Sequence, residues 1–145
     1  GNKVITNSII NGAVNRISVA SESGNVTMIY NTQVSVNTLS ITKEFSSSIV
    51  QLESNFAYLV GYLGLRSFYI YIYRNGSLVY TRYYGSSYTN TSSTLFDSDN
   101  FTIQYVDGTA GVGSVSYDVR VKNVDSSGAY TIVNQASLSL VEVKK

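Results

Sequence analysis

Apolar and polar residues alternate with a period of two along nearly the whole chain. Ile17 and Val19, for example, alternate with Arg16 and Ser18. Such alternation is typical of β-strands that bury one face. No stretch has the spacing of an amphipathic helix of useful length. The pattern therefore predicts an all-β protein.

The alternation changes phase once in the first third of the chain. Val34 and Val36 begin a strand, and after Asn37–Thr38 the apolar positions continue as Leu39 and Ile41. A slip of one residue would turn the apolar side chains to the opposite face of a sheet. We therefore predict a β-bulge or a bend at this point.

The middle of the chain contains its longest apolar region. A turn is expected at Ser46–Ser48, followed by a strand near Ile49–Glu53. From Phe56 to Tyr73 the apolar residues fall on both faces, which is typical of a central, covered strand. Glycines and the charge of Arg66 interrupt this region, so it predicts buried strand and no membrane insertion.

The clearest turn in the sequence is Asn75–Gly76, which predicts a two-residue β-hairpin because both turn positions require positive φ. Pairing Arg74 with Ser77 then assigns the side chains to two faces. One face is aliphatic and is predicted to face the core, with Phe68, Ile70, Ile72, Val79, Thr81 and Tyr83. The other is a tyrosine stripe with Tyr69, Tyr71, Tyr73, Leu78, Tyr80 and Arg82.

Composition excludes several classes of function. Charged residues make up 13% of the chain and the net charge is +1, which does not indicate nucleic acid binding. Histidine and cysteine are absent, which removes the usual general base and the commonest transition-metal ligand. No catalytic or nucleotide-binding motif is found. We therefore expect no enzymatic activity and no cofactor.

Two short segments resemble ligand sites on first inspection. Gly108–Gly113 is glycine-rich like a phosphate loop, but it leads into an alternating strand and not into a helix, which favours an interstrand loop. Asp97, Asp99 and Asn100 could offer oxygen ligands to calcium. They lack the glycine and distal glutamate of an EF-hand loop, so a solvated turn is predicted and no metal site.

The tyrosine stripe has three open interpretations. It can be an outer sheet face that the N-terminal strands partly cover. It can be a subunit interface, since interface cores are enriched in Tyr and Arg and depleted of acids. It can also be a ligand platform, on which sugars stack against aromatic rings.

The last third of the chain resembles the TNF/C1q-like jelly-roll domains that form trimeric heads of virus and phage fibres, spikes and turrets. The segment DGTAGVGSVSYDVRV has the Gly-containing loop and the strand with an aromatic residue followed by aliphatics. The chain then closes with a strand of the L-x-L-x-E kind, here Leu138, Leu140 and Glu142. The hairpin YIYIYRNGSLVY is similar to the central hairpin of the family. The resemblance covers about the C-terminal 90 residues, and a proline common in the loop is replaced by Thr109–Ala110.

The resemblance implies an antiparallel two-sheet sandwich with jelly-roll topology that assembles as a homotrimer. The residues expected at the threefold axis or interface are Tyr69, Tyr71, Tyr73, Tyr80, Arg82 and Tyr117. Receptor contacts are expected from the loops Gly85–Ser98 and Gly108–Gly113, with Tyr88, Asn90, Thr91, Asp97, Asp99 and Thr109 as the candidates.

These observations predict one domain over residues 1–145, with N-terminal strands in 1–50 and a jelly-roll core in 56–145. The predicted function is a non-enzymatic, trimeric head on a virion surface that attaches to a host glycan or protein receptor. The alternative is a secreted or cell-surface module for carbohydrate binding or adhesion. Both place the protein outside the cell.

Overall fold

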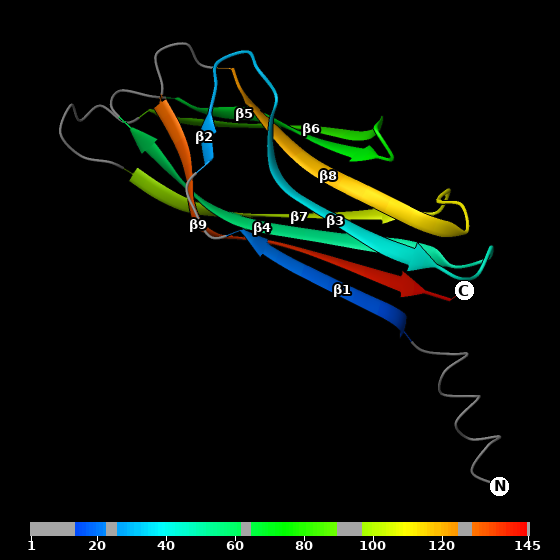
Figure 1. Cartoon of the computed structure of the whole chain (residues 1–145). Helices are drawn as coiled ribbons and strands as arrows, with labels where there is room; N and C mark the ends of the chain where they lie inside the picture. The colour runs from blue at the N-terminus through cyan, green and yellow to red at the C-terminus, as the bar shows by residue number, and fades with distance from the viewer. Residues whose placement is uncertain (1–13, 23–25, 62–64, 90–96, 125–128, 145) are drawn as a thin grey trace, which may run out of the picture.

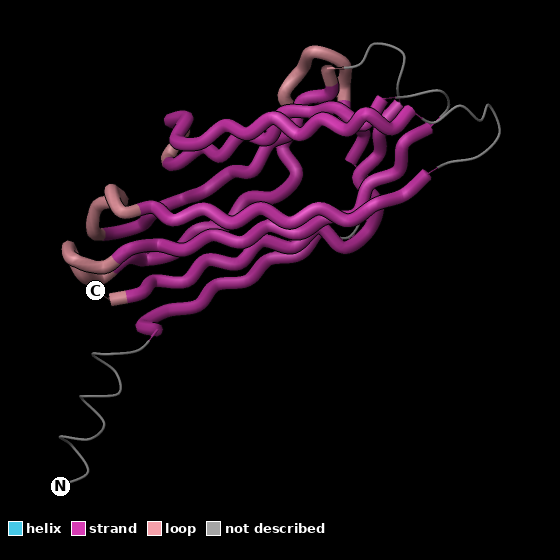
Figure 2. Tube along the Cα trace, turned by 180° about the vertical axis from the view of Figure 1, so that it is seen from behind, coloured by secondary structure: helices cyan, strands magenta, loops and turns pink. Residues whose placement is uncertain are grey.

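The computed structural model describes residues 14–22, 26–61, 65–89, 97–124 and 129–144. This part of the chain consists of strands joined by turns (Figures 1 and 2), and it contains no helix that could span a membrane. The strands are β1 Val14–Glu22, β2 Val26–Met28, β3 Val34–Lys43, β4 Ile49–Gly61, β5 Leu65–Arg74, β6 Ser77–Thr89, β7 Asp97–Asp107, β8 Gly113–Asn123 and β9 Ala129–Val143.

Two antiparallel sheets form a sandwich, as the sequence predicts (Figure 1). Sheet A has the order β1-β9-β4-β7, and the short β2 also pairs with β9; sheet B has the order β3-β8-β5-β6. Apart from β2 and the β5–β6 hairpin, the chain passes from one sheet to the other with each strand, which is the connectivity of a jelly roll. The predicted fold class is confirmed.

The core lies between the sheets and follows the alternation along each strand. In β8 every second residue is buried, so that Val115, Tyr117, Val119 and Val121 face inward. In β5, Phe68, Ile70 and Ile72 have no exposed surface. The ring of Phe68 in sheet B makes tilted and edge-on contacts with Phe56 and Phe101 in sheet A, which also contact each other.

Three predicted local features are confirmed. The register of β3 against β8 shifts between Ser35 and Asn37, so a bulge lies where the alternation changes phase. The turn between β3 and β4 lies at residues 46–47. Asn75 and Gly76 form the hairpin turn with φ of 47° and 82°, and Arg74 pairs with Ser77.

The predicted register beyond this turn is wrong. A second bulge at Val79 shifts β6 by one residue, so Ile72 pairs with Tyr80 and Ile70 with Arg82. Tyr80 and Arg82 therefore lie on the inward side of sheet B, and Thr81 and Tyr83 lie on the outward side. The bulge lets large rings fill the space below the edge strand: the Tyr80 ring lies 5.2 Å from that of Tyr105.

Candidate functional site: the outer face of sheet B

Tyrosines from two strands lie on the outer face of sheet B. Alternation in β5 puts Tyr69, Tyr71 and Tyr73 outward, opposite the buried Phe and Ile side chains. β6 adds Tyr83, which pairs with Tyr69 at a distance of 5.1 Å between ring centres. The rings of Tyr69 and Tyr71 are stacked, with centres 6.0 Å apart.

Two cations from β8 lie over these rings. The guanidinium carbon of Arg120 is 4.4 Å from the centre of the Tyr73 ring. The Nζ atom of Lys122 is 5.4 Å from the Tyr69 ring and 5.8 Å from the Tyr71 ring. These are cation–π contacts, in which the face of the aromatic ring attracts the charged group. We call Tyr69, Tyr71, Tyr73, Tyr83, Arg120 and Lys122 the tyrosine face.

Hydrogen bonds fix the tyrosine face to the neighbouring edge strand. Asp118 accepts a bond of 2.6 Å from Arg120 Nε and one of 2.6 Å from Ser35 Oγ on β3. The Tyr73 hydroxyl donates to the Gln33 side-chain oxygen at 2.8 Å. The side chains of the tyrosine face are therefore ordered before any partner binds.

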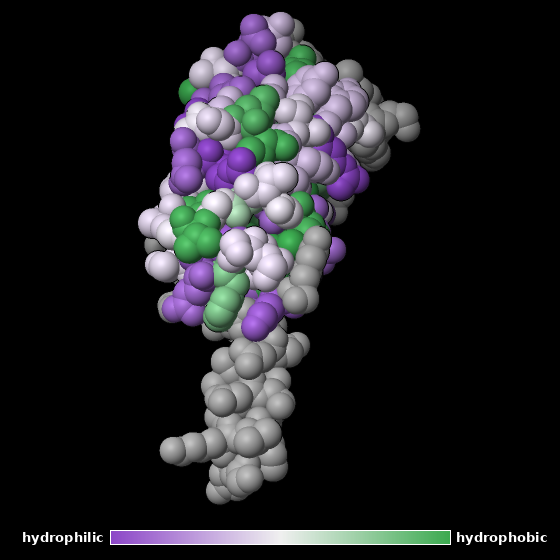
Figure 3. All heavy atoms as spheres, turned by 90° about the vertical axis from the view of Figure 1, so that its right-hand side faces the viewer, coloured by the Kyte–Doolittle hydropathy of each residue, from purple (hydrophilic) through white to green (hydrophobic). Residues whose placement is uncertain are grey.

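The surface that a partner could reach lies mainly over β6. Tyr71 is only 8% exposed because its neighbours cover it, whereas Tyr83 is 54% and Leu78 is 51% exposed. Leu78 pairs with Tyr73 and lies on the same outward side. Figure 3 views the end of the sandwich that carries the β5–β6 hairpin turn, where hydrophobic residues form small groups between polar ones.

The residues predicted at the interface do not all lie on one surface of the structure. Tyr69, Tyr71 and Tyr73 lie together on the tyrosine face, as the hairpin pattern predicts. Tyr80 and Arg82 lie on the other side of the sheet, and Tyr117 is 0% exposed in the core, so it does not reach a surface. Sequence reasoning missed Tyr83, Arg120 and Lys122. The alternation of Asp118, Arg120 and Lys122 with buried aliphatics was visible, but the pairing of β8 with β5 was not.

Tyr117 belongs to a polar cluster between the sheets. Its hydroxyl donates to Asp107 Oδ2 at 2.9 Å, and Arg74 Nη1 donates to the two carboxylate oxygens of Asp107 at 2.9 and 2.8 Å. Burial would raise the pKa of Asp107, but hydrogen bonds from Thr109, Tyr117 and Arg74 outweigh it and hold the pKa below its usual value. Burial, followed by the bond to Asp107, raises the pKa of Tyr117 far above its usual value.

The predicted receptor loops are partly strand. Thr109 does lie in the β7–β8 loop, but its hydroxyl binds Asp107 and Arg74. Tyr88 is in β6, and Asp97 and Asp99 are in β7. The expected solvated turn at Asp97–Asn100 is therefore strand. Asn90 and Thr91 lie outside the described residues. The described residues contain no group of acidic side chains that could hold a metal ion.

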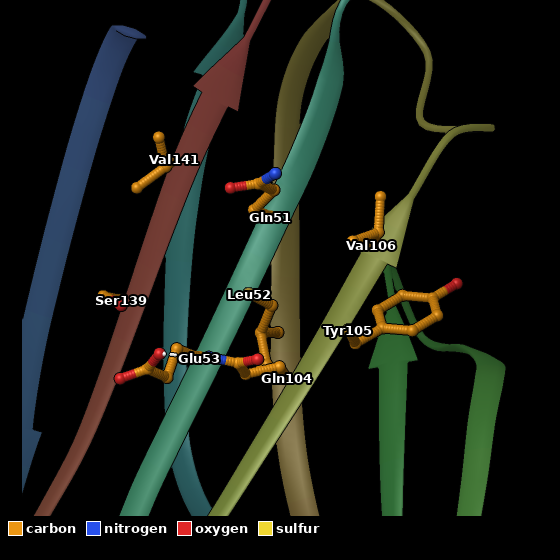
Figure 4. A pocket seen from close by; sticks show the side chains of 8 residues that line it. All are labelled: Gln51, Leu52, Glu53, Gln104, Tyr105, Val106, Ser139 and Val141. Carbon is orange, nitrogen blue, oxygen red and sulfur yellow. Dashed lines mark hydrogen bonds between the residues drawn. The ribbon is translucent and has the colours of Figure 1, made fainter.

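A second candidate surface is a hollow on the outer face of sheet A (Figure 4). It has a volume of about 240 Å³. Glu53 accepts a hydrogen bond of 2.8 Å from Gln104 and one of 3.2 Å from Asn55, and these bonds lower the pKa of Glu53. Its lining is Gln51, Leu52, Glu53, Gln104, Tyr105, Val106, Ser139 and Val141. Amides, a hydroxyl and a carboxylate can hydrogen-bond a polyhydroxylated ligand, with no metal needed.

Fold and surfaces together define a class: a jelly-roll β-sandwich with ordered polar and aromatic outer faces. No family model and no curated protein matches the chain. Among solved structures, it is similar in fold to infectious bursal disease virus Gx strain, with 12% identity, a TM-score of 0.46, and coverage of 90% of this chain and 37% of that one. It is similar to dimeric latent PorU from Porphyromonas gingivalis, with 11% identity, a TM-score of 0.48, and coverage of 89% and 13%.

The chain therefore spans well under half the length of these two proteins. It is also similar to Bacillus endospore appendages described as a family of disulfide-linked pili, with 16% identity, a TM-score of 0.38, and coverage of 93% of this chain and 94% of that one. These likenesses concern the β-sandwich alone. The TNF/C1q-like resemblance stays a prediction.

Proposed function

We propose that this chain is a non-enzymatic structural module of a virion or other extracellular surface, which associates as a homotrimer and attaches to a host receptor. The observation that carries the proposal is the tyrosine face, where ordered Tyr and Arg side chains lie beside exposed Leu78 and Tyr83. Aromatic and arginine side chains in such an arrangement are typical of interface cores. The polar side chains around Asp107 hydrogen-bond to one another within the sandwich. This supports a structural role for the cluster and not an active site.

The low exposure of Tyr71 and Tyr117 supports a threefold contact made by other residues. Tyr117 lies in the core, and neighbouring side chains cover Tyr71 on the outer face. The accessible part of the outer face, Leu78 and Tyr83 with the half-buried Tyr69 and Tyr73, is where we place the contact.

Replacing Leu78 with glutamate should dissociate the trimer, because the acid would be desolvated against an apolar partner surface. Light scattering at low micromolar concentration should give three times the 15.8 kDa chain mass for the native chain, and a monomer for Leu78→Glu. The matched control is Val106→Glu, an exposed apolar residue on sheet A, which should leave the mass unchanged. A monomeric native chain would contradict the homotrimer.

The hollow of sheet A favours one alternative, a carbohydrate-binding or adhesion module. There Glu53 and Gln104 would hydrogen-bond sugar hydroxyls. One variant distinguishes the two functions. If the alternative holds, Glu53→Ala should abolish glycan binding and leave the assembly of the chain unchanged.

A further inference from the structure

β6 is one of the two edge strands of sheet B. Its one side pairs with β5, and within the described chain no strand pairs with its other side. An edge strand presents unpaired backbone N–H and C=O groups, which natural proteins protect with charges, proline or bulges. How each edge of this sandwich is protected therefore indicates where another chain can add a strand.

The edges of sheet A carry more charged residues than β6. β7 includes Asp97, Asp99 and Asp107, and β1 includes Arg16 and Glu22 and a register irregularity at its start. β3, the other edge strand of sheet B, lies against β1 and β9, whereas among the described residues β6 has comparable contact with β5 alone. From Ser77 to Thr89, β6 has no acid, no lysine and no proline, and Arg82 is its single charge.

The pairing of β6 with β5 defines which part of this edge is regular. Register shifts occur at Val79 and again after Gly85, and between them Tyr80 to Gly85 pair with β5 without interruption. In this stretch Thr81, Arg82 and Tyr83 are exposed. The Tyr83 ring also lies over Gly85, since a Cβ atom added at Gly85 would be 2.5 Å from it.

Symmetry limits how two copies of this stretch can pair. In an antiparallel pair related by a twofold axis perpendicular to the sheet, outward residues of one chain lie opposite outward residues of the other. One residue of β6 must therefore lie opposite the same residue of the second chain. Centring on Arg82 would place two guanidinium groups opposite one another, which is unfavourable. Centring on Thr81 would pair Tyr83 with Val79, at the bulge.

Centring on Tyr83 avoids both problems. It places Tyr83 opposite Tyr83 of the second copy, Arg82 opposite Tyr84, and Thr81 opposite Gly85. All of these residues lie in the uninterrupted stretch. The cation of each Arg82 then meets an aromatic side chain of the other copy, which is a favourable pair.

We propose that two copies of this chain pair through β6, antiparallel and centred on Tyr83, to join their B sheets into one continuous sheet of eight strands. The contact is isologous, as expected for a twofold interface. Because it involves only one strand edge and not a whole sheet face, we expect less buried area than the about 800 Å² per partner of a standard interface, and therefore weak, concentration-dependent pairing. It goes beyond the proposed function. It shares Tyr83 with the proposed threefold contact, but it needs the backbone groups at the free edge of β6 and not the side chain of Leu78, so a Leu78 variant tells the two contacts apart.

Single cysteines test this register directly, because the chain has no cysteine of its own. Tyr83→Cys should form a disulfide dimer with copper phenanthroline, since Cβ atoms of directly opposite residues are about 4.5–5.5 Å apart. In the Thr81→Cys variant the two cysteines would be four positions apart along the paired strands, about 13 Å. Its cross-linked fraction should therefore be about tenfold lower than that of Tyr83→Cys. Val106→Cys, exposed on sheet A, should behave like Thr81→Cys.

Equal cross-linking of the three variants would overturn the proposal, and so would cross-linking of Thr81→Cys alone. The double variant Leu78→Glu with Tyr83→Cys separates this proposal from the proposed function: it should still cross-link even though the trimer is lost. A native trimer whose Tyr83→Cys variant gives no dimer would support the threefold contact and overturn the pairing.

The native chain provides a second readout. At high protein concentration, amide hydrogen exchange of residues 81–85 should slow, while exchange at the β7 edge should not change. Exchange in residues 81–85 that is independent of concentration would overturn the pairing.

Discussion

Replacing Asp107 with alanine should lower the free energy of unfolding by about 3–5 kcal/mol, the cost of removing one partner from a buried ion pair. The Asp107 side chain is 1% exposed and that of Arg74 is 24% exposed. The carboxylate also accepts hydrogen bonds from the Thr109 N–H and from the Tyr117 hydroxyl. Without it, a partly buried guanidinium and a fully buried hydroxyl lose their partner. Urea denaturation followed by tyrosine fluorescence would measure the loss.

The position of Asp107 explains why the effect should be global. Asp107 ends β7 in sheet A, whereas Arg74 and Tyr117 lie on β5 and β8 in sheet B. The carboxylate therefore links the two sheets at the end of the sandwich that carries the β5–β6 hairpin turn. Tyr117→Phe is the matched control: it removes a single hydrogen bond and should cost about 1 kcal/mol. An Asp107→Ala loss no larger than that of Tyr117→Phe would contradict the role of Asp107.

The same cluster predicts how stability depends on acid. The pKa of Asp107 is lower in the folded chain than its usual value of 3.8, so the folded state favours the ionised form. The stabilisation is complete above the pKa of the unfolded state and is lost as pH falls through the lower pKa of the folded state. Asp107→Asn should remove this part of the acid dependence. An unchanged acid denaturation curve would count against the cluster.

Local pattern was enough to predict the strands of this sandwich but not their partners. The alternation after Gly113 predicted the strand that became β8, although Tyr117 on it was expected at an interface and lies in the core; Asn75–Gly76 predicted the hairpin. The pairing of β8 with β5, which brings Arg120 and Lys122 over the tyrosines, joins segments far apart in sequence. No local sequence pattern predicts this strand pairing.

The bulge at Val79 shows why register was only partly predictable. A turn fixes the first pair, Arg74 with Ser77, but packing fixes the pairs beyond it. The inserted residue turns Tyr84 toward the rings of Phe68 and Phe101, at 5.1 and 5.0 Å. The contact with Phe101 depends on the opposite sheet, so packing overrides the alternation that β6 shows by itself.

Buried charge was the other feature that the sequence concealed. Charged residues are seldom fully buried unless they are paired, so the pattern gives no reason to place Lys43 and Glu142 in the interior. They are 1% and 0% exposed. In the sequence, Glu142 belongs only to a closing strand that resembles a family pattern, whereas in the structure its side chain organises a turn in another part of the chain.

Glu142 accepts hydrogen bonds from donors of the β3–β4 turn, and Lys43 donates to carbonyl groups of the same turn. The carboxylate accepts bonds from the backbone N–H of Glu44 at 3.0 Å and of Phe45 at 3.1 Å, and from the Ser48 hydroxyl. The Lys43 ammonium donates to the backbone carbonyl of Phe45 at 2.6 Å. A buried charge from β9 and a buried charge from β3 thus supply hydrogen bonds to the backbone of the turn from its inner side.

Replacing Glu142 with alanine should therefore cost about 3 kcal/mol or more, because three hydrogen bonds to a charged group are lost, each worth about 1.5–3 kcal/mol when the charged group is buried. The loss should begin at the turn: amide exchange at Glu44 and Phe45 should accelerate more than exchange in the centre of β4. Glu142→Gln keeps one acceptor oxygen and should fall between the native chain and the alanine variant. Glu53→Ala is the matched control, because it removes a carboxylate from the outer face of sheet A and should change stability far less. Equal losses for Glu142→Ala and Glu53→Ala would show that the buried carboxylate does not hold the turn.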